Sequence, residues 1–259
     1  MNEFILLTGA SSGIGLSMAR LLAAQKQNLI LVARRLDRLE TLKAELVNEH
    51  GIIVYTFAKD LSSTDEVVAL HHEISALSLL VTRLVNNAGF GTYGPFDEGA
   101  LEPDLRMINL NVGAVVTLTK LFLPDMKRRG SGHIMNVASL LSFLPFPYYS
   151  VYSATKAFVL SFSETLEAEL AGSGVTVSAF CPGPVDTGFT TDAMLKTNAY
   201  ATNKPADVQW VAAVGVRHLL SGKGVKIVGR LNWLLANTPR FSPRWLTMRI
   251  NKFLASPKR

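Results

Sequence analysis

Phe4-Ile-Leu-Leu-Thr-Gly-Ala-Ser-Ser-Gly-Ile-Gly15 decides the fold of this chain. The four apolar residues Phe4 to Leu7 predict a buried strand, and the stretch Leu16 to Ala24 predicts a helix directly after the glycines. Strand, glycine-rich turn and helix in this order are typical of the first unit of a dinucleotide-binding sheet.

The glycines give the turn a physical role at each position. Gly9 permits a tight turn, Gly13 lets a phosphate approach the backbone, and Gly15 lets the helix pack against the sheet. The N-terminus of the helix then offers free N–H groups to an anion. The alternative is a glycine-rich turn without a ligand. The predicted cofactor contacts in this turn are Gly9, Ser11, Ser12, Gly13, Ile14 and Gly15.

A second strand, Asn28 to Ala33, ends at Arg34 and Arg35 instead of an acidic residue. An acid at this point binds the ribose hydroxyls of NAD, whereas arginine accommodates the 2′-phosphate of NADP. We therefore expect NADP(H), with Arg34 as the main contact and Arg35 in support. The alternative is that the arginines are solvated residues that open the next helix, Leu36 to Glu49.

Strand and helix patterns alternate along the rest of the chain. This alternation predicts an α/β fold, a Rossmann-like doubly wound parallel sheet of about seven strands with helices on both faces. We expect a single nucleotide-binding catalytic domain over 1–229 and a basic, apolar-rich extension over 230–259. The further strands are expected at 52–58, 84–86, 132–137, 175–181 and 225–228, and the further helices at 64–75, 103–127, 152–172 and 205–221.

Tyr152 and Lys156 stand four residues apart in Tyr-Ser-Ala-Thr-Lys. On a helix this spacing puts both side chains on one face. A nearby ammonium group favours the ionised form of a phenol, so we expect Lys156 to lower the pKa of Tyr152 and make it a proton donor and acceptor. Alone the pair is weak evidence, because both residues are common on amphipathic helices.

Taken together, six motifs resemble the short-chain dehydrogenase/reductase family, in its single-domain form of ~250 residues. The resemblance covers residues 3 to about 229 and is nearest to a ketoacyl- or carbonyl-reductase-like branch with a basic C-terminal extension. The motifs, in the family's order, are Thr8 to Gly15, Asn86-Asn-Ala-Gly89, Asn111, Ser139, Tyr152 to Lys156, and Pro182-Gly-Pro-Val-Asp-Thr187.

The resemblance implies catalytic roles for four residues. Tyr152 would donate a proton to the carbonyl oxygen of the substrate, or accept one from an alcohol. Lys156 would lower the pKa of the tyrosine and bind the nicotinamide ribose. Ser139 would hold the developing oxyanion, and Asn111 would anchor a water that links Lys156 to solvent.

The resemblance also implies further cofactor contacts. Asp60 would contact the adenine ring, with Leu61 beside it. The segment Asn87 to Gly89 would support the adenosine side of the cofactor pocket. The Pro182 segment would lie near the nicotinamide carboxamide. The contacts implied are Asp60, Leu61, Asn87, Ala88, Gly89, Tyr152, Lys156, Pro182, Gly183, Val185 and Thr187.

Apolar residues flank the predicted catalytic group. We expect a substrate pocket with a lipophilic ketone, aldehyde or ketoacyl substrate, and a mobile lid over 184–204. Alternatively, many of these residues belong to the core or to a subunit interface. The predicted pocket residues are Phe90, Ser139, Leu140, Phe143 and Tyr149.

The C-terminal fifth concentrates positive charge. From Val208 onward there are ten Lys and Arg residues and no acid; because the chain carries a net charge of +6, the remainder carries −4. Apolar residues interleave with the cations: Leu246, Ile250, Phe253 and Leu254 are predicted on one helix side, Phe241, Trp245 and Met248 on another. We expect these apolar residues to be buried against the core or a partner subunit, or to contact a membrane surface. No motif beside the charge points to nucleic acid.

The cysteine, the histidines and the hydropathy of the chain bear on its cellular compartment and on its ligands. Cys181 ends an apolar strand and is expected to be a buried packing residue, not a nucleophile. The five histidines lack metal-ligand spacing, so we expect no metal. With no signal peptide and no apolar run of ~18 residues, we expect a protein of the cytoplasm, free or held at the inner face of a membrane. The family resemblance implies a homodimer or homotetramer.

Three functions remain open from the sequence. The first is an NADPH-dependent oxidoreductase that reduces a carbonyl to an alcohol. The second is a non-catalytic NADP-binding sensor or scaffold on the same fold. The third is an NAD-linked dehydrogenase working toward oxidation, which Arg34 disfavours.

Overall fold

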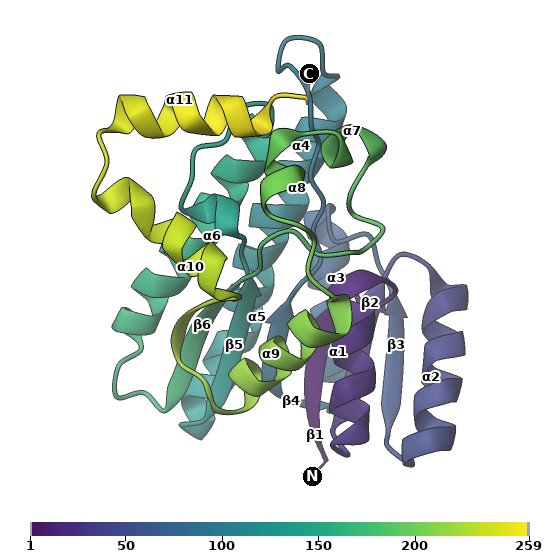
Figure 1. Ribbon diagram of the computed structural model, residues 1–259. Coiled ribbons are helices and arrows are strands. Elements are labelled where there is room, and N and C mark those ends of the chain that lie inside the picture. The colour runs from purple at the N-terminus through teal and green to yellow at the C-terminus, as the bar shows by residue number, and fades with distance from the viewer. Residues whose placement is uncertain (1, 258–259) are drawn as a thin grey trace.

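The computed structural model describes residues 2–257. Its centre is a sheet of seven parallel strands in the order β3-β2-β1-β4-β5-β6-β7 (Figure 1). The predicted doubly wound α/β fold is therefore confirmed. The strands are β1 Glu3–Thr8, β2 Asn28–Ala33, β3 Val54–Ala58, β4 Leu80–Asn86, β5 Gly132–Val137, β6 Val175–Cys181 and β7 Gly224–Ile227.

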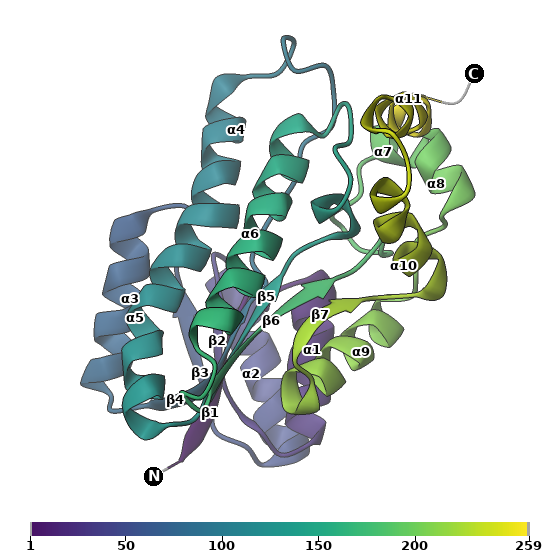
Figure 2. The same ribbon diagram turned by 90° about the vertical axis from the view of Figure 1, so that its left-hand side faces the viewer.

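Helices cover both faces of the sheet (Figure 2). On one face α1 (Gly13–Ala24), α2 (Leu36–His50) and α9 (Val208–Ser221) pack on alternate strand residues such as Ile5 and Leu7. On the other, α3 (Thr64–Ala76) and α5 (Ala114–Arg129) pack on Phe4 and Leu6. The helix α6 (Ser150–Glu169) covers β6 on this second face. Because both faces are buried, the stretches Phe4 to Leu7 in β1 and Leu29 to Val32 in β2 are continuously apolar, as their sequences predicted.

The reversal of strand order lies between β1 and β4. The chain winds from β1 outward to β3, then crosses back to β4 on the other side of β1. In open α/β sheets, ligands bind beyond the carboxyl ends of the strands at this switch point. The fold thus brings the loops after β1, β2, β4, β5 and β6 to one end of the sheet.

The helix expected at 103–127 is present from Leu101 to Arg129 but contains a wider turn. The π-helical turn Asn109–Gly113 joins α4 (Leu101–Ile108) to α5. The wider turn fits Asn111, whose amide bonds with the backbone of Phe90 and the hydroxyl of Thr155 instead of facing solvent. Such turns inside α-helices are frequent at functional sites.

The same segment also corrects the expectation that no apolar run is long enough to span a membrane. By length and composition alone Leu101–Arg129 passes that test, with a mean hydropathy of 1.4 over 18 residues. Its inner face, including Met107, Leu118 and Phe122, is buried in the protein. Core helices of globular proteins pass the same test, and this helix packs against the sheet.

Several boundaries differ from the predictions. β4 begins at Leu80 instead of Leu84, because it pairs with β1 from Glu3 onward despite two polar residues. β3 begins two residues later than expected, and α9 three residues later. The expected lid contains two short helices, α7 (Asp192–Leu195) and α8 (Asn198–Thr202).

The C-terminal segment forms two helices above the carboxyl end of the sheet. They are α10 (Arg230–Asn237) and α11 (Arg244–Ala255), linked by a 3₁₀ turn. Both views place α11 next to α7 and α8 (Figures 1 and 2). Ala236 and Ala255 are buried in the same apolar cluster as Tyr149 and Tyr152. Within residues 230–257, the extension therefore packs on the domain along one side; Lys258 and Arg259, counted among its cations, lie outside the described residues.

Candidate functional site

The glycine turn after β1 leaves a cradle at the start of α1. Gly9 and Gly13 have φ angles of +69° and +54°, the left-handed region that favours glycine. Ser12 precedes the helix, and its side chain accepts no hydrogen bond from the first turn. The first N–H groups of α1 are thus free of a side-chain cap and can bind an anion.

Gly15 acts one layer behind this cradle. A Cβ atom at Gly15 would lie 2.3 Å from the carbonyl oxygen of Gly9 and 2.6 Å from Nδ2 of Asn87. The same amide of Asn87 donates to the carbonyl of Thr8 at 2.9 Å. Gly15 therefore shapes the turn and does not line the cavity, in contrast to its predicted role as a direct contact.

A cavity of about 410 Å³ extends from this turn across the carboxyl ends of the strands. Most of the residues predicted from the sequence line it; the exceptions are Gly15, Asn111 and Phe143. The predicted residues that line it are Gly9, Ser11, Ser12, Gly13, Ile14, Arg34, Arg35, Asp60, Leu61, Asn87, Ala88, Gly89, Phe90, Ser139, Leu140, Tyr149, Tyr152, Lys156, Pro182, Gly183, Val185 and Thr187.

Arg34 and Arg35 lie exposed at the rim, after β2. Nη2 of Arg35 donates to Oγ of Ser11 at 3.4 Å, which bridges the end of β2 to the glycine turn. No carboxylate follows β2 at this position. The rim therefore presents two guanidinium groups where a ribose would meet the protein, and these suit a phosphate.

Asp60 lines the cavity but its carboxylate already has partners. It accepts from Nη2 of Arg106 at 2.6 Å and from Oγ of Ser62 at 2.7 Å. Burial raises the pKa of Asp60, yet the Ser62 hydrogen bonds and the Arg106 charge outweigh it and hold the pKa below its ordinary value. The carboxylate mainly anchors this loop to α4, which the resemblance did not indicate.

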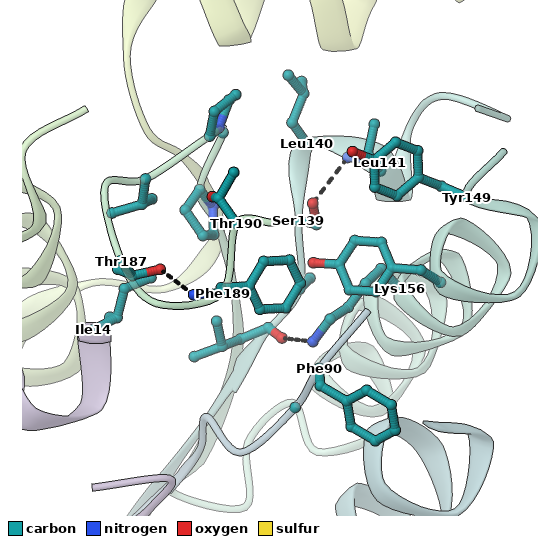
Figure 3. A pocket seen from close by; sticks show the side chains of 18 of the residues that line it. Ile14, Phe90, Ser139, Leu140, Leu141, Tyr149, Lys156, Thr187, Phe189 and Thr190 are labelled. Carbon is teal, nitrogen blue, oxygen red and sulfur yellow. Dashed lines mark hydrogen bonds between the residues drawn. The ribbon is translucent and has the colours of Figure 1, made fainter. Parts of the chain in front are cut away.

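Tyr152 and Lys156 lie in the first turns of α6, and both are buried. Nζ of Lys156 donates to the carbonyl of Val137 at 2.8 Å and lies 5.9 Å from the centroid of the Tyr152 ring. Figure 3 shows the lysine reaching across the floor of the pocket to that carbonyl. The pair shares one helix face, as its spacing predicted.

The expected fall in the pKa of Tyr152 does not occur in the chain alone. Burial raises the pKa of Tyr152 to about 12, although a hydrogen bond with the Ser139 side chain lowers it. Burial likewise lowers the pKa of Lys156 to about 8. The prediction counted only the attraction between two charges, whereas desolvation disfavours the charged form of each group.

Ser139 follows β5 and starts a short 3₁₀ turn, Leu140–Ser142. Its Oγ accepts from the N–H of Leu141 at 3.1 Å (Figure 3). Its own N–H donates to Oγ of Ser142. These bonds fix the hydroxyl at the cavity wall beside Tyr152. Ser142 in turn donates to the carbonyl of Lys156, so a hydrogen bond joins the turn to α6.

Asn111 lies behind the cavity and is fully buried. Its Nδ2 donates to the carbonyl of Phe90, and its Oδ1 accepts from the N–H of the same residue. A Cβ atom on Gly89 would lie 2.9 Å from Oδ1 of Asn111 and 3.4 Å from Nζ of Lys156. Gly89 thus leaves room for the amide of Asn111 and the ammonium of Lys156 to lie close to the same point of the backbone.

The residues predicted for the substrate wall line the cavity, with the exception of Phe143. Phe90, Leu140 and Tyr149 line the cavity, while Phe143 packs in the apolar layers between the 3₁₀ turn and α6. Many lining residues that were not predicted come from the lid and the C-terminal helices, and others, such as Leu144 and Phe146, come from the loop after β5. Those from the lid and the C-terminal helices include Phe189, Thr190, Tyr200 and Asn203, then Leu235, Thr238, Ser242, Thr247, Ile250, Asn251 and Leu254.

A periodic signal for the C-terminal members was present in the sequence. Thr247, Asn251 and Ala255 recur every four residues and form the buried face of α11. The pattern of apolar residues alone predicted Phe253 on the same side of the helix as Leu254. In the structure Phe253 faces solvent. Polar residues on the inner face, such as Asn251, made the buried stripe hard to recognise.

Comparisons with known proteins agree with this geometry. A family model described as short chain dehydrogenase matches residues 3–198. The very-long-chain 3-oxoacyl-CoA reductase of Rattus norvegicus is 32% identical over 257 residues, which cover 95% of this chain and 77% of that protein. Ketoacyl reductase HetN of a Nostoc species is 37% identical over 190 residues, 73% of this chain and 66% of that protein.

Solved structures show the same fold. A short-chain dehydrogenase from Sphingobium yanoikuyae in complex with NADPH is 30% identical, with a TM-score of 0.79 over 92% of this chain and 93% of that one. L-Sorbose reductase from Gluconobacter frateurii, complexed with NADPH and L-sorbose, is 27% identical, with a TM-score of 0.76 over 88% and 95%. The family match, the sheet and the glycine turn lead to one conclusion: this chain belongs to the short-chain dehydrogenase/reductase family of nicotinamide-dependent oxidoreductases.

Proposed function

We propose that this protein uses NADPH to reduce the carbonyl group of a lipophilic ketone, aldehyde or ketoacyl compound to an alcohol, with Tyr152 as the proton donor. One observation carries the proposal. A single cavity joins the glycine turn at its nucleotide end to the buried Ser139, Tyr152 and Lys156 at the other. A nucleotide-binding scaffold without catalysis needs the first part of this arrangement and not the second.

The nucleotide end fits a dinucleotide. The uncapped start of α1 offers N–H groups to the pyrophosphate, and Gly13 faces Thr187 across the cradle, with a Cβ position 3.3 Å from Cγ2 of Thr187. Arg34 and Arg35 would hold the 2′-phosphate that distinguishes NADPH from NADH. When bound, NADPH supplies the hydride for the carbonyl carbon.

The protonation states suit a reduction. Because burial raises the pKa of Tyr152 to about 12, its phenol carries a proton at neutral pH and can donate it to a carbonyl oxygen. The hydroxyl of Ser139 beside it would hydrogen-bond the same oxygen and stabilise its developing charge. A pKa of about 8 lets Lys156 gain and release a proton near neutral pH, which suits the resupply of Tyr152.

The walls of the pocket favour a lipophilic substrate. Phe146, Tyr149, Phe189 and Leu254 join Phe90 around the catalytic end. Apolar linings occur in most ligand pockets, so the lining alone does not identify the substrate. The names of the relatives give further support for a lipophilic substrate. The rat relative is named for reduction of a very-long-chain 3-oxoacyl thioester, and the Nostoc relative for a ketoacyl group. We therefore place acyl chains with a 3-oxo group first among the candidates.

The test is a panel of ketones, aldehydes and 3-oxoacyl thioesters of increasing chain length, followed by NADPH absorbance. We expect turnover to rise with chain length. Tyr152→Phe should lower kcat about 10²–10⁴-fold with NADPH binding retained. Tyr148→Phe is the matched control, because Tyr148 lies four residues earlier and outside the cavity. Unchanged turnover in Tyr152→Phe would contradict the mechanism.

A further inference from the structure

The outer side of the C-terminal helices exposes large apolar side chains. Trp233 is 58% exposed on α10, Phe241 is 88% exposed in the turn after it, and Trp245 and Phe253 are each 66% exposed on α11. With Leu234 and Ile250, these residues form what we call the C-terminal patch. Monomeric soluble proteins rarely expose so many large apolar residues together without a partner.

The inner side of the same helices is fixed to the protein. Nδ2 of Asn251 donates to the carbonyl of Pro145 at 2.9 Å, in the loop between Ser139 and Tyr152. The hydroxyl of Tyr93 donates to the carbonyl of Ala255 at 2.7 Å. Because these bonds hold α11 in one orientation, the outward face of Trp245 and Phe253 belongs to the folded structure. The core therefore covers only one side of the extension.

Cations surround the C-terminal patch. Arg230, Arg240, Arg244, Arg249 and Lys252 are exposed, and within residues 2–257 none forms an ion pair with a carboxylate. The sequence contains no Asp or Glu from Val208 to its end. On α11, Trp245, Arg249, Lys252 and Phe253 share the outward face. Aromatic and basic residues together on one helix face are typical of segments that lie in a membrane interface.

A second copy of the chain is a poorer partner for this surface. In a two-fold dimer the same patch meets itself. Five cations of one copy would then face five of the other, with no acid in the segment to separate them. Like charges placed together across an interface oppose association. Anionic phospholipid headgroups supply the complementary charge, and acyl chains supply the apolar environment.

We propose that the C-terminal patch docks the protein on the surface of an anionic phospholipid bilayer, with α10 and α11 lying along the interface. Ile250 lines the substrate cavity and is also 46% exposed in the patch. Docking would therefore bring one edge of the cavity to the lipid, where a lipophilic substrate accumulates. This last consequence rests on the proposed function, whereas the docking itself does not.

Tryptophan fluorescence tests the docking directly, because two of the three tryptophans lie in the patch. Trp210→Phe with Trp233→Phe leaves Trp245 as the only reporter. With phosphatidylcholine vesicles that contain phosphatidylserine and brominated acyl chains, we expect a blue shift and quenching of Trp245. Vesicles of phosphatidylcholine alone should give a much weaker effect, and added salt should weaken binding to the anionic vesicles.

Charge and apolar variants of the full chain separate the contributions. Arg244→Glu with Arg249→Glu should weaken binding to anionic vesicles about twentyfold or more, since each cation near such a surface contributes roughly fivefold. Trp245→Ser with Phe253→Ser should also abolish sedimentation with vesicles while thermal unfolding stays the same. The matched control, Arg38→Glu with Arg217→Glu, changes two exposed cations on α2 and α9 and should bind like the unmodified protein.

Three outcomes would overturn the proposal. The first is that the protein shows no preference for anionic vesicles. The second is that the matched control loses binding as much as Arg244→Glu with Arg249→Glu does. The third is that the protein self-associates and that Trp245→Ser with Phe253→Ser removes this self-association. The last result would assign the patch to a second copy. None of these measurements requires turnover, so a failure here leaves the reductase function untouched, and a failure of that function leaves the docking untouched.

Discussion

Lys156 is a charged residue held where the protein disfavours its charge. Its ammonium is buried and faces the ring of Tyr152 instead of a carboxylate, and within residues 2–257 its one hydrogen-bond partner is the carbonyl of Val137. Burial lowers the pKa of Lys156 from 10.5 to about 8. A position of this kind reduces stability at neutral pH, and perturbed pKa values of this kind cluster at functional sites.

Replacing Lys156 should therefore stabilise the protein while it abolishes activity. Lys156→Met keeps most of the apolar volume of the side chain and removes its charge. The free energy of unfolding at pH 7 should therefore rise by up to about 3 kcal/mol. The loss of the hydrogen bond to Val137 reduces this gain. Because the folded-state pKa is depressed, the unfolded chain binds more protons between pH 8 and 10.5, and unmodified protein gains stability as pH rises there.

The measurement is urea unfolding of both proteins from pH 7 to 10.5. The difference between them should shrink as pH rises through 8. The contribution of Tyr152, whose pKa burial raises, cancels in that difference, whereas the contribution of Cys181 does not cancel fully, because Lys156 lowers the pKa of that buried thiol. A constant difference over this range would show that Lys156 is not held as the structure implies.

Arg34 gives a second prediction at the residue scale, on cofactor choice. Arg34→Ala should weaken NADPH binding roughly 10- to 100-fold, the value of one charge-assisted hydrogen bond, and leave NADH binding unchanged. Fluorescence titration with both nucleotides measures this. Arg38→Ala is the control, because Arg38 is an exposed arginine in the first turn of α2 and does not line the cavity. Equal losses for both nucleotides would show that Arg34 does not read the 2′-phosphate.

Local chemistry was the most predictable part of the site. The glycine spacing, the arginines after β2 and the Tyr152–Lys156 spacing are properties of short segments, and the structure places all of them at one cavity. The pKa of Tyr152 was not predictable, because it depends on burial by residues distant in the chain. The partner of Asp60, Arg106 on α4, lies 46 residues away and left no local signal.

At the scale of elements, the β1–α1 unit depends on close backbone approach. Gly15→Ala would place a methyl group 2.3 Å from the carbonyl oxygen of Gly9, so the turn must shift. We expect a loss of about 1–3 kcal/mol in stability, as for other overpacked sites, together with weaker nucleotide binding. Calorimetry and NADPH titration measure the two effects.

The same substitution at Gly113 should have the opposite sign. Gly113 has helical angles, φ −56° and ψ −51°, and nothing lies within 4 Å of its Cβ position. Alanine there restricts the unfolded chain and should stabilise the protein by roughly 0.5–1 kcal/mol. If Gly15→Ala and Gly113→Ala changed the stability by the same amount, the contact with the carbonyl oxygen of Gly9 would not explain the first result.

Element positions followed from the sequence where periodicity was regular, and failed where tertiary contacts decide. β2, β5 and β6 have the predicted bounds because apolar runs and turn residues delimit them. The π-helical turn at Asn109–Gly113 could not be predicted, since it is stabilised by bonds to Phe90 and Thr155. The fold of α11 over the pocket depends on Asn251 and Tyr93, whose partners are 106 and 162 residues away.

At the scale of the whole molecule, two exposed apolar surfaces differ in charge. The C-terminal patch is surrounded by cations alone. The second surface lies on α4, α5 and α6, where Leu101, Leu105 and Ile108 form a stripe beside Val116 and Phe158. Acids and bases alternate around this second surface, including Glu102, Asp104, Arg106 and Lys120. Mixed charge suits a surface that meets its own copy.

We therefore expect a homodimer formed by the α4–α6 surface, which leaves the C-terminal patch free for lipid. Phe158 is 42% exposed and lies within that surface. Its ring stacks on that of Phe162, with 5.9 Å between the ring centroids. Phe158→Glu should weaken self-association at least about thirtyfold, because a central aromatic is lost twice in a two-fold interface. Val47→Glu, 40% exposed on α2 across the sheet, should not. Sedimentation equilibrium measures both; dissociation by Val47→Glu as well, or a monomer throughout, would remove this interface from consideration.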